Sequence, residues 1–219
     1  RTAMYSFWAL VICVVIGYPV AYYTARLAGK RRGLILALIL APWWINYITR
    51  MLAWVNLLQD DGYVNKFLGI FGVAPVSWLS GNSFTVVMAL AYGYLPYFIL
   101  PLFVAIDRID GRQIEAARDL GASPLSAFLR VTLPLSVPGI LAGGVLIALP
   151  MFGDYYTADL VSSSTQTNMI GNQIDEFMRQ GSEKVTGAAL TLLLSVFLLV
   201  LMFYYLRTTR RAGTSAQTA

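Results

Sequence analysis

The sequence has 219 residues, of which 58% are hydrophobic and only 12% are charged. Soluble domains carry about 25% charged residues, so this composition predicts a surface that faces lipid. Histidine is absent and Cys13 is the single cysteine. These counts exclude a catalytic imidazole, a histidine-ligated metal, a disulfide framework and a zinc knuckle.

Five apolar stretches are long enough to cross a bilayer, since a transmembrane helix needs about 20 residues. They are predicted over residues 5–28, 33–58, 83–106, 133–152 and 185–206. The fourth stretch is rich in glycine and proline, which favours an interior helix that lines a pathway. The sequence therefore predicts an all-α, polytopic membrane helical bundle, with residues 1–219 forming one transmembrane domain.

Arginine and lysine gather in alternate loops, which sets the orientation. Residues 26–32, at and after the end of the first stretch, and the loop 107–132 hold four each, and the tail holds three. The segments 59–82 and 153–184 hold seven acidic residues against three basic ones. We therefore expect the basic loops and the C-terminus in the cytoplasm, the acidic segments outside, and no nucleic-acid partner for a net charge of +5. With five spans the first residue then lies outside, so a sixth span is expected before Arg1.

The loop 107–132 has the local pattern of a helix, a turn and a second helix. Residues 115–120 are mostly good helix formers, and Gly121 suits the left-handed position after a helix. Ser123 and Pro124 fit the cap and the first position of the next helix. An apolar face on that helix is predicted from Leu125, Phe128, Leu129 and Thr132. By itself the pattern also fits an ordinary amphipathic hairpin between two spans.

The spacing within this loop resembles a known family signature. Glu115-Ala116-Ala117, Gly121, Val131, Leu133 and Pro134 match the signature of the inner-membrane permeases of ATP-binding-cassette (ABC) importers, with valine where isoleucine is more common. The resemblance implies a type I importer permease fold in the bacterial inner membrane. It also implies that Glu115, Ala116, Ala117 and Gly121 belong to a coupling helix that docks into a cleft on an ATPase subunit.

The same resemblance implies the partners. The chain has no Gly-x-x-x-x-Gly-Lys-[Ser/Thr] phosphate loop, so ATP and Mg²⁺ are expected on a separate ATPase and no catalytic residue or cofactor is expected here. Two ATPase copies, a homologous second permease and an extracytoplasmic substrate-binding protein complete the expected assembly. The segment 153–184, in which residues 170–179 are predicted to form a short amphipathic helix, is a candidate docking surface for the binding protein.

The substrate expectation also rests on resemblance. The run 114–123, together with 42–54, 61–65, 152–160 and 169–172, is similar to the spermidine/putrescine (PotB-type) branch of the family. A polyamine needs carboxylates for its ammonium groups and aromatic faces for cation–π contacts. Candidate pathway residues of both kinds are Asp154, Tyr155, Tyr156 and Asp159.

Other interpretations remain open. The four pathway candidates also fit a helix cap at the membrane surface, where tyrosines are enriched. A permease of the same architecture for ferric iron, thiosulfate, an opine or an amino-acid derivative is the main alternative. An ATP-independent secondary transporter or channel is a remote one. Arg50, inside an apolar stretch, is expected to reach outward or to pair with an acidic residue.

Overall fold

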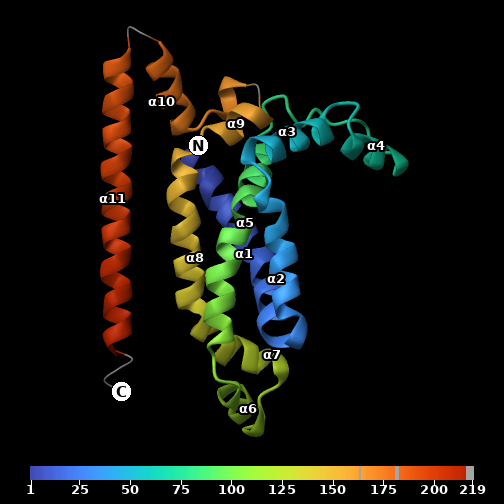
Figure 1. Ribbon diagram of the computed structural model, residues 1–219, viewed down its shortest axis with the longest axis vertical. Helices are drawn as coiled ribbons and strands as arrows, with labels where there is room; N and C mark the ends of the chain where they lie inside the picture. The colour runs from blue at the N-terminus through green and yellow to red at the C-terminus, as the bar shows by residue number, and fades with distance from the viewer. Residues whose placement is uncertain (163, 181–182, 216–219) are drawn as a thin grey trace. The chain divides into compact units, whose positions relative to one another are not determined.

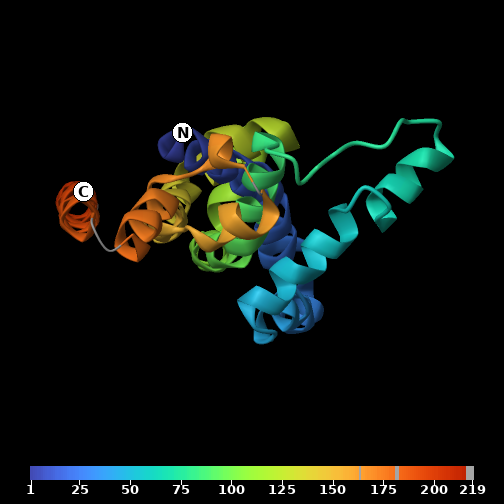
Figure 2. The same cartoon turned by 90° about the horizontal axis from the view of Figure 1, so that it is seen from above.

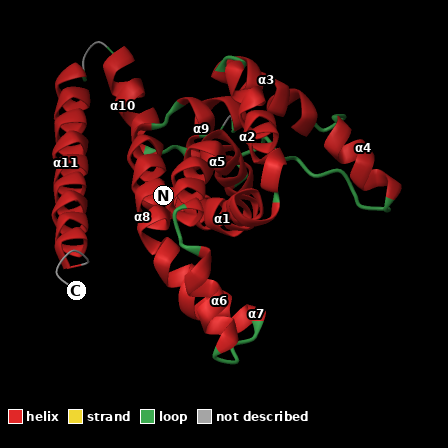
Figure 3. Cartoon of the chain, turned by 60° about the horizontal axis from the view of Figure 1, so that its bottom comes forward, coloured by secondary structure: helices red, strands yellow, loops and turns green. Residues whose placement is uncertain are grey.

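The computed structural model describes residues 1–162, 164–180 and 183–215. These residues form helices joined by turns and loops, and the described part contains no strand (Figure 3). The longer helices are α1 (Thr2–Tyr22), α5 (Ser83–Asp107), α8 (Leu133–Gly153) and α11 (Lys184–Ser215). The shorter helices are α2 (Arg32–Leu40), α3 (Tyr47–Leu58), α4 (Tyr63–Ile70), α6 (Gly111–Asp119), α7 (Pro124–Ala127), α9 (Tyr156–Val161) and α10 (Ile170–Arg179). The expected all-α fold class is confirmed.

The stretch 33–58 differs from the single continuous helix expected for it. Helix α2 ends at Leu40, a 3-10 turn covers Ala41–Trp44, and Ile45 is extended with ψ of 140° before α3 begins. Pro42 has no N–H for an α-helical hydrogen bond, which favours the tighter turn at this point. Among the described residues four helices are long and apolar enough to cross a membrane, or five if this broken pair is one span.

The helix before the fourth predicted span also starts earlier than expected. Helix α7, a π-helical turn over Phe128–Thr132 and α8 follow one another without a loop, so one apolar helix runs from Pro124 to Gly153. The helix starts at the capped Ser123–Pro124, and no glycine or proline interrupts residues 125–133, which join α7 to α8. The second half of the predicted cytoplasmic loop is therefore part of the spanning helix.

The chain divides into two units, each with its own internal packing. The second unit comprises residues 10–46 and 91–147. Within it, a Cβ on Gly17 would lie 2.8 Å from Cδ1 of Phe98, and a Cβ on Gly139 would clash with the Cβ of Ala105. Small residues therefore let α1 and α8 approach α5 closely, as is common between membrane helices. Phe98 is fully buried in this core.

The first unit comprises residues 1–9, 47–90 and 148–219. Its segment 59–82 is organised by Asn65, whose Nδ2 donates to the carbonyls of Gln59, Asp60 and Val76 at 3.0–3.3 Å. The Oδ1 of Asn65 accepts from the indole N–H of Trp78 at 3.0 Å. Helix α4 leads into this loop, which has no regular structure over its first part (Figure 2).

In the same unit α10 packs against α11, and the residues around Gly187 explain why. A Cβ on Gly187 would lie 3.1 Å from the side chain of Met178, so the missing side chain of glycine favours this close approach. Further along α11 the aromatic rings of Phe152 and Phe197 lie 5.8 Å apart. Only 6% of the apolar window of α11 is buried, which leaves an aliphatic surface suited to lipid (Figure 1).

Candidate functional site

The hairpin of α6 and α7 carries the family signature. Helix α6 begins with a side-chain cap, since Oδ1 of Asp110 accepts a hydrogen bond from the N–H of Arg112 at 3.0 Å. Such a cap satisfies one of the free N–H groups at a helix start and contributes about 1 kcal/mol. The structure thus gives the hairpin a defined first residue, which the sequence pattern did not identify.

The turn after α6 is a Schellman motif. The N–H of Ala122 donates to the carbonyl of Ala117 at 3.0 Å, and the N–H of Gly121 donates to the carbonyl of Arg118 at 2.9 Å. Gly121 has φ of +88°, a left-handed conformation that glycine adopts without the steric cost of a Cβ. The predicted role of Gly121 as the end of a helix is confirmed, and it reverses the chain between α6 and α7.

The start of α7 also follows the local prediction. The Oγ of Ser123 accepts from the N–H of Ser126 at 3.2 Å, and Pro124 occupies the first helical position. The predicted apolar face divides into a packed part and an exposed part. Phe128 packs edge-on against Tyr18 and Tyr22, with ring centroids 5.7 and 5.5 Å apart, and Thr132 is buried. Leu125 and Leu129 are 66% and 50% exposed.

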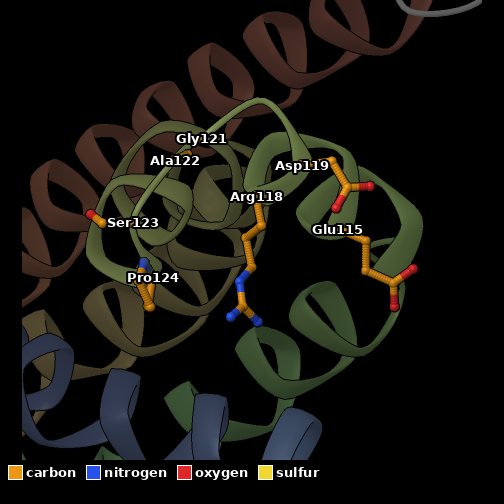
Figure 4. A pocket seen from close by; sticks show the side chains of 7 residues that line it. All are labelled: Glu115, Arg118, Asp119, Gly121, Ala122, Ser123 and Pro124. Atoms are coloured by element: carbon orange, nitrogen blue, oxygen red, sulfur yellow. The ribbon is translucent and has the colours of Figure 1, made fainter.

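The tip of the hairpin presents a polar hollow of about 470 Å³. Its lining includes two of the four predicted coupling residues, Glu115 and Gly121, and Figure 4 shows the carboxylates of Glu115 and Asp119 on one side of Arg118. The other two, Ala116 and Ala117, lie on α6 but do not line the hollow, and Ala116 is exposed. The four predicted coupling residues thus all belong to α6 and the turn that follows it.

Leu120 lies beside this hollow and was not singled out from the sequence. Its side chain is 89% exposed at the C-terminal end of α6. A large aliphatic side chain that contacts so little of its own chain is a candidate contact for another protein. The signal in the sequence is a leucine placed at the helix end, directly before the turn glycine, where a polar residue would suit water equally well.

Within the second unit, Arg26 holds the segment that leads into the hairpin. Its Nη2 donates to the carbonyl of Ile106 at 2.8 Å and to the carbonyl of Ile109 at 2.5 Å. The carbonyl of Ile106 lies in the last turn of α5, where backbone acceptors lack partners within the helix, and Ile109 lies two residues beyond the end of α5. A positive charge is also favourable at that end of a helix. Arg26 therefore fixes the segment that leads directly into α6.

The four pathway candidates lie in the first unit, at the start of α9. Asp154 uses both carboxylate oxygens on Thr157: Oδ1 accepts from the N–H at 3.0 Å and Oδ2 accepts from the hydroxyl at 2.7 Å. Tyr47 also forms a hydrogen bond with the Thr157 hydroxyl, and the Arg50 guanidinium lies 5.6 Å from the ring centroid of Tyr47. Arg50 is only 8% exposed, so of the two alternatives expected for it the outward-reaching one is wrong, and pairing with an acidic residue stays a prediction.

Asp159 belongs to a second network around Asn172. The Nδ2 of Asn172 donates to Oδ1 of Asp159 at 2.6 Å and to the carbonyl of Tyr155 at 2.8 Å. Asn172 is buried, and its Oδ1 accepts from the N–H of Met169 at 2.9 Å. The start of the predicted helix 170–179, which is present as α10, is thereby bonded to α9.

A second hollow, of about 350 Å³, lies beside this network. It is lined by Asp159 together with Asp175 and Glu176 of α10. Arg179 also lines it and pairs with Asp175 at 2.8 Å. Sequence reasoning did not select the two α10 carboxylates, although their spacing from Asn172 places them on the same helix face.

Tyr155 and Tyr156 do not line this hollow, and neither does Asp154. The rings of Tyr155 and Tyr156 stack on each other with centroids 4.2 Å apart. A hydrogen bond to Tyr156 raises the pKa of Tyr155 to about 12, so its phenol is neutral at physiological pH. The structure thus separates the four candidates into a turn carboxylate, an aromatic pair and one carboxylate that faces a cavity. None of the described residues form a cluster of three or more metal ligands.

Comparisons with known proteins agree with this architecture. Residues 7–213 match the family described as the binding-protein-dependent transport system inner membrane component. The chain is 38% identical to the spermidine/putrescine transport system permease protein PotB of Haemophilus influenzae, covering 91% of this chain and 70% of that protein. It is 36% identical to PotB of Escherichia coli, covering 92% and 74% respectively.

Solved structures show the same fold at lower sequence identity. A crystal structure of a bacterial alginate ABC transporter, in complex with an alginate pentasaccharide-bound periplasmic protein, aligns with a TM-score of 0.77 at 19% identity over 96% of this chain and 76% of that one. An amino acid ABC transporter crystallised with histidines aligns with a TM-score of 0.61, also at 19% identity, over 96% and 90%. The chain therefore belongs to the family of binding-protein-dependent transport system inner membrane components, as a multi-pass ABC importer permease of the PotB type.

Proposed function

We propose that this permease forms half of a translocation pathway for spermidine and putrescine. The observation that carries the proposal is the 36–38% identity, over more than 90% of the chain, to relatives named as permeases for these two polyamines. A polyamine is a flexible polycation, and its pathway must offer acceptors for ammonium groups within a largely apolar protein.

The external network supplies the chemistry for such a cargo. Asp159, Asp175 and Glu176 share one hollow, and a single arginine offsets only part of their charge. We assign Asp159 as the pathway carboxylate, with the stacked faces of Tyr155 and Tyr156 available for cation–π contact. Asp154 contributes through the turn that it closes with Thr157, rather than by direct contact.

Transport is driven from the α6–α7 hairpin by a separate ATPase that binds ATP and Mg²⁺. Glu115, Ala116, Ala117 and Gly121 provide the docking surface, and the exposed side chain of Leu120 inserts into the ATPase. The capped α6, the Schellman turn and the unbroken helix 124–153 form a rigid connection. A rigid element is what alternating access requires, since it converts closure of the ATPases into a movement of the membrane helices.

The orientation of the hairpin determines where the other subunits bind. The hairpin and the C-terminus face the cytoplasm, consistent with the basic loops. A homologous second permease completes the pathway, two ATPase copies bind below it, and an extracytoplasmic binding protein delivers the polyamine to the segment 153–184.

Uptake of radiolabelled spermidine and putrescine tests the substrate. Cells that carry the complete operon are expected to accumulate both, and an Asp159→Asn variant is expected to lose most of this uptake. Gln173→Ala, an exposed change on α10 outside the hollow, serves as the matched control. Uptake that unlabelled polyamines leave unchanged, but that ferric iron, thiosulfate, opines or amino acids inhibit, would assign the permease to another solute.

The coupling role is tested separately in purified complexes. Glu115→Ala is expected to weaken ATPase binding while the permease still inserts into the membrane, whereas Gln113→Ala on the same exposed helix is expected to be silent. Wild-type transport in membranes without ATP would contradict the coupling proposal and favour a secondary transporter or channel. Equal ATPase binding by both variants would remove Glu115 from the docking surface.

A further inference from the structure

Helices α5 and α8 form an apolar groove in the second unit that the transport proposal does not use. The groove has a volume of about 480 Å³. Its lining residues include Tyr97, Pro101 and Arg108 on one side and Gly139, Ala142 and Leu146 on the other. The two helices run side by side in Figure 1, and the close approach of Gly139 to Ala105 forms the floor between them.

The length of the groove corresponds to one leaflet of a bilayer. Tyr97 and Arg108 are eleven positions apart, which is about 16 Å at 1.5 Å per helical residue. The hydrocarbon core of a bilayer is about 30 Å thick, so one leaflet accounts for about 15 Å. An acyl chain that lies in the groove would therefore extend from the headgroup level at Arg108 to the bilayer centre near Tyr97.

Three arginines near the end of α5 have different surroundings. Arg26 donates to the carbonyls of Ile106 and Ile109, as described above. Arg32 pairs with Asp107 at 3.4 Å. Among the described residues that line the groove, Arg108 carries the one charged side chain. It is exposed and lies just beyond the last residue of α5.

The charge and the side of the membrane indicate what occupies this end. The arginine distribution assigns the end of α5 to the cytoplasmic side, where bilayers hold anionic lipids. An Arg guanidinium matches the geometry of a phosphate group, and its alkyl stem packs along apolar surface. An apolar groove with one cation at the headgroup level is therefore complementary to an anionic phospholipid.

We propose that the α5–α8 groove is a binding site for an anionic phospholipid of the inner leaflet. One acyl chain occupies the groove from Leu146 to Gly139, and the phosphate of the headgroup binds Arg108. Because α5 leads directly into α6 and α8 continues the helix that begins at Pro124, a lipid in this groove contacts both helices that hold the hairpin.

Thermal unfolding of the purified transporter complex tests the site. Phosphatidylglycerol, phosphatidylcholine with the same acyl chains, and inorganic phosphate are each titrated into the detergent-solubilised complex. Phosphatidylglycerol is expected to stabilise the wild type at a lower concentration than phosphatidylcholine, and phosphate is expected to have no effect. Arg108→Gln is expected to weaken the phosphatidylglycerol response about fivefold, which corresponds to about 1 kcal/mol.

Two further variants separate the groove from general charge effects. Arg112→Gln removes an exposed arginine at the start of α6 outside the groove, and its response is expected to remain within twofold of the wild type. Ala142→Phe fills the groove without changing a charge, and it is expected to weaken the response even if Arg108→Gln does not fold.

Several results would overturn the proposal. Equal stabilisation by phosphatidylglycerol and phosphatidylcholine would exclude headgroup recognition, and stabilisation by inorganic phosphate would identify a simple anion site. A loss with Arg112→Gln as large as that with Arg108→Gln would indicate a diffuse surface charge. An efficient disulfide between a Leu146→Cys variant and the second permease would show that a protein helix fills the groove.

Discussion

Replacing Gly121 with alanine separates the conformation of the hairpin from its chemistry. A Cβ at this position would meet no atom within 4 Å, so the substitution introduces no clash. The φ of +88° remains, and an L-residue in the left-handed region costs about 1–2 kcal/mol. If the closed Schellman turn is the form that the ATPase binds, this cost weakens binding by up to about 5- to 30-fold. Asparagine, which tolerates this region better, is expected to lose less.

The assay is the equilibrium affinity of the purified ATPase subunits for the permease complex in lipid nanodiscs. Gly72→Ala is the matched control, because Gly72 has φ of +75°, also has no atom within 4 Å of a Cβ, and lies in the first unit. The Gly72→Ala substitution imposes the same kind of backbone strain at a position that is distant from the hairpin in the sequence. The reasoning is refuted if Gly121→Ala binds the ATPase as the wild type does, or if Gly72→Ala weakens binding equally.

Three further substitutions test the surrounding structure. Arg26→Gln removes a charged donor from the end of α5, so it is expected to lower the thermal unfolding midpoint and to reduce ATP-driven uptake. Arg31→Gln, at an exposed position, is the control and is expected to change neither. Equal unfolding midpoints for the two variants would contradict the capping role of Arg26. Asn172→Ala breaks the bonds between α9 and α10, so amide hydrogen exchange across residues 155–172 is expected to accelerate, and unchanged protection would argue against the network. Gly139→Ala overpacks the contact between α5 and α8 and is expected to destabilise by about 1–3 kcal/mol in thermal unfolding. Gly33→Ala, which has open space around it within α2, is expected to be neutral or to stabilise by up to about 1 kcal/mol, because alanine favours a helix over glycine.

Local chemistry explains which parts of the candidate site were predictable. Gly121 and the pair Ser123–Pro124 define a turn through hydrogen bonds between residues a few positions apart, and the sequence pattern for such a turn is direct. The predicted helix 170–179 has the same bounds as α10, because its apolar and polar residues alternate with a helical period. The hairpin could be located from the family signature, because the residues of the signature are close together in the chain.

Contacts between distant residues explain what was missed. Arg26 binds carbonyls 80 and 83 positions away, and nothing near Arg26 in the chain indicates that partner. The hydrogen bond from Asn172 to Asp159 also joins residues that are distant in the chain. Asp154 and Asp159 were both selected as pathway carboxylates, but only this contact between α9 and α10 places Asp159 beside a cavity, whereas Asp154 closes a local turn with Thr157. Leu125 and Phe128 were placed on one apolar face, but only Phe128 packs against aromatic rings of α1, because the helical period does not say what a face meets.

The sequence by itself determined the class of the molecule. A long apolar run needs no tertiary partner to prefer lipid, and the capped turn forms from its own residues, so spanning helices and the hairpin could be read directly. Only the tertiary structure decided that Arg26 binds carbonyls at the end of α5, that Asn172 joins Asp159 to α10, and that α5 and α8 enclose a groove ending at Arg108. These features depend on side chains brought together by helix packing, and helical periodicity specifies a face without specifying what that face meets.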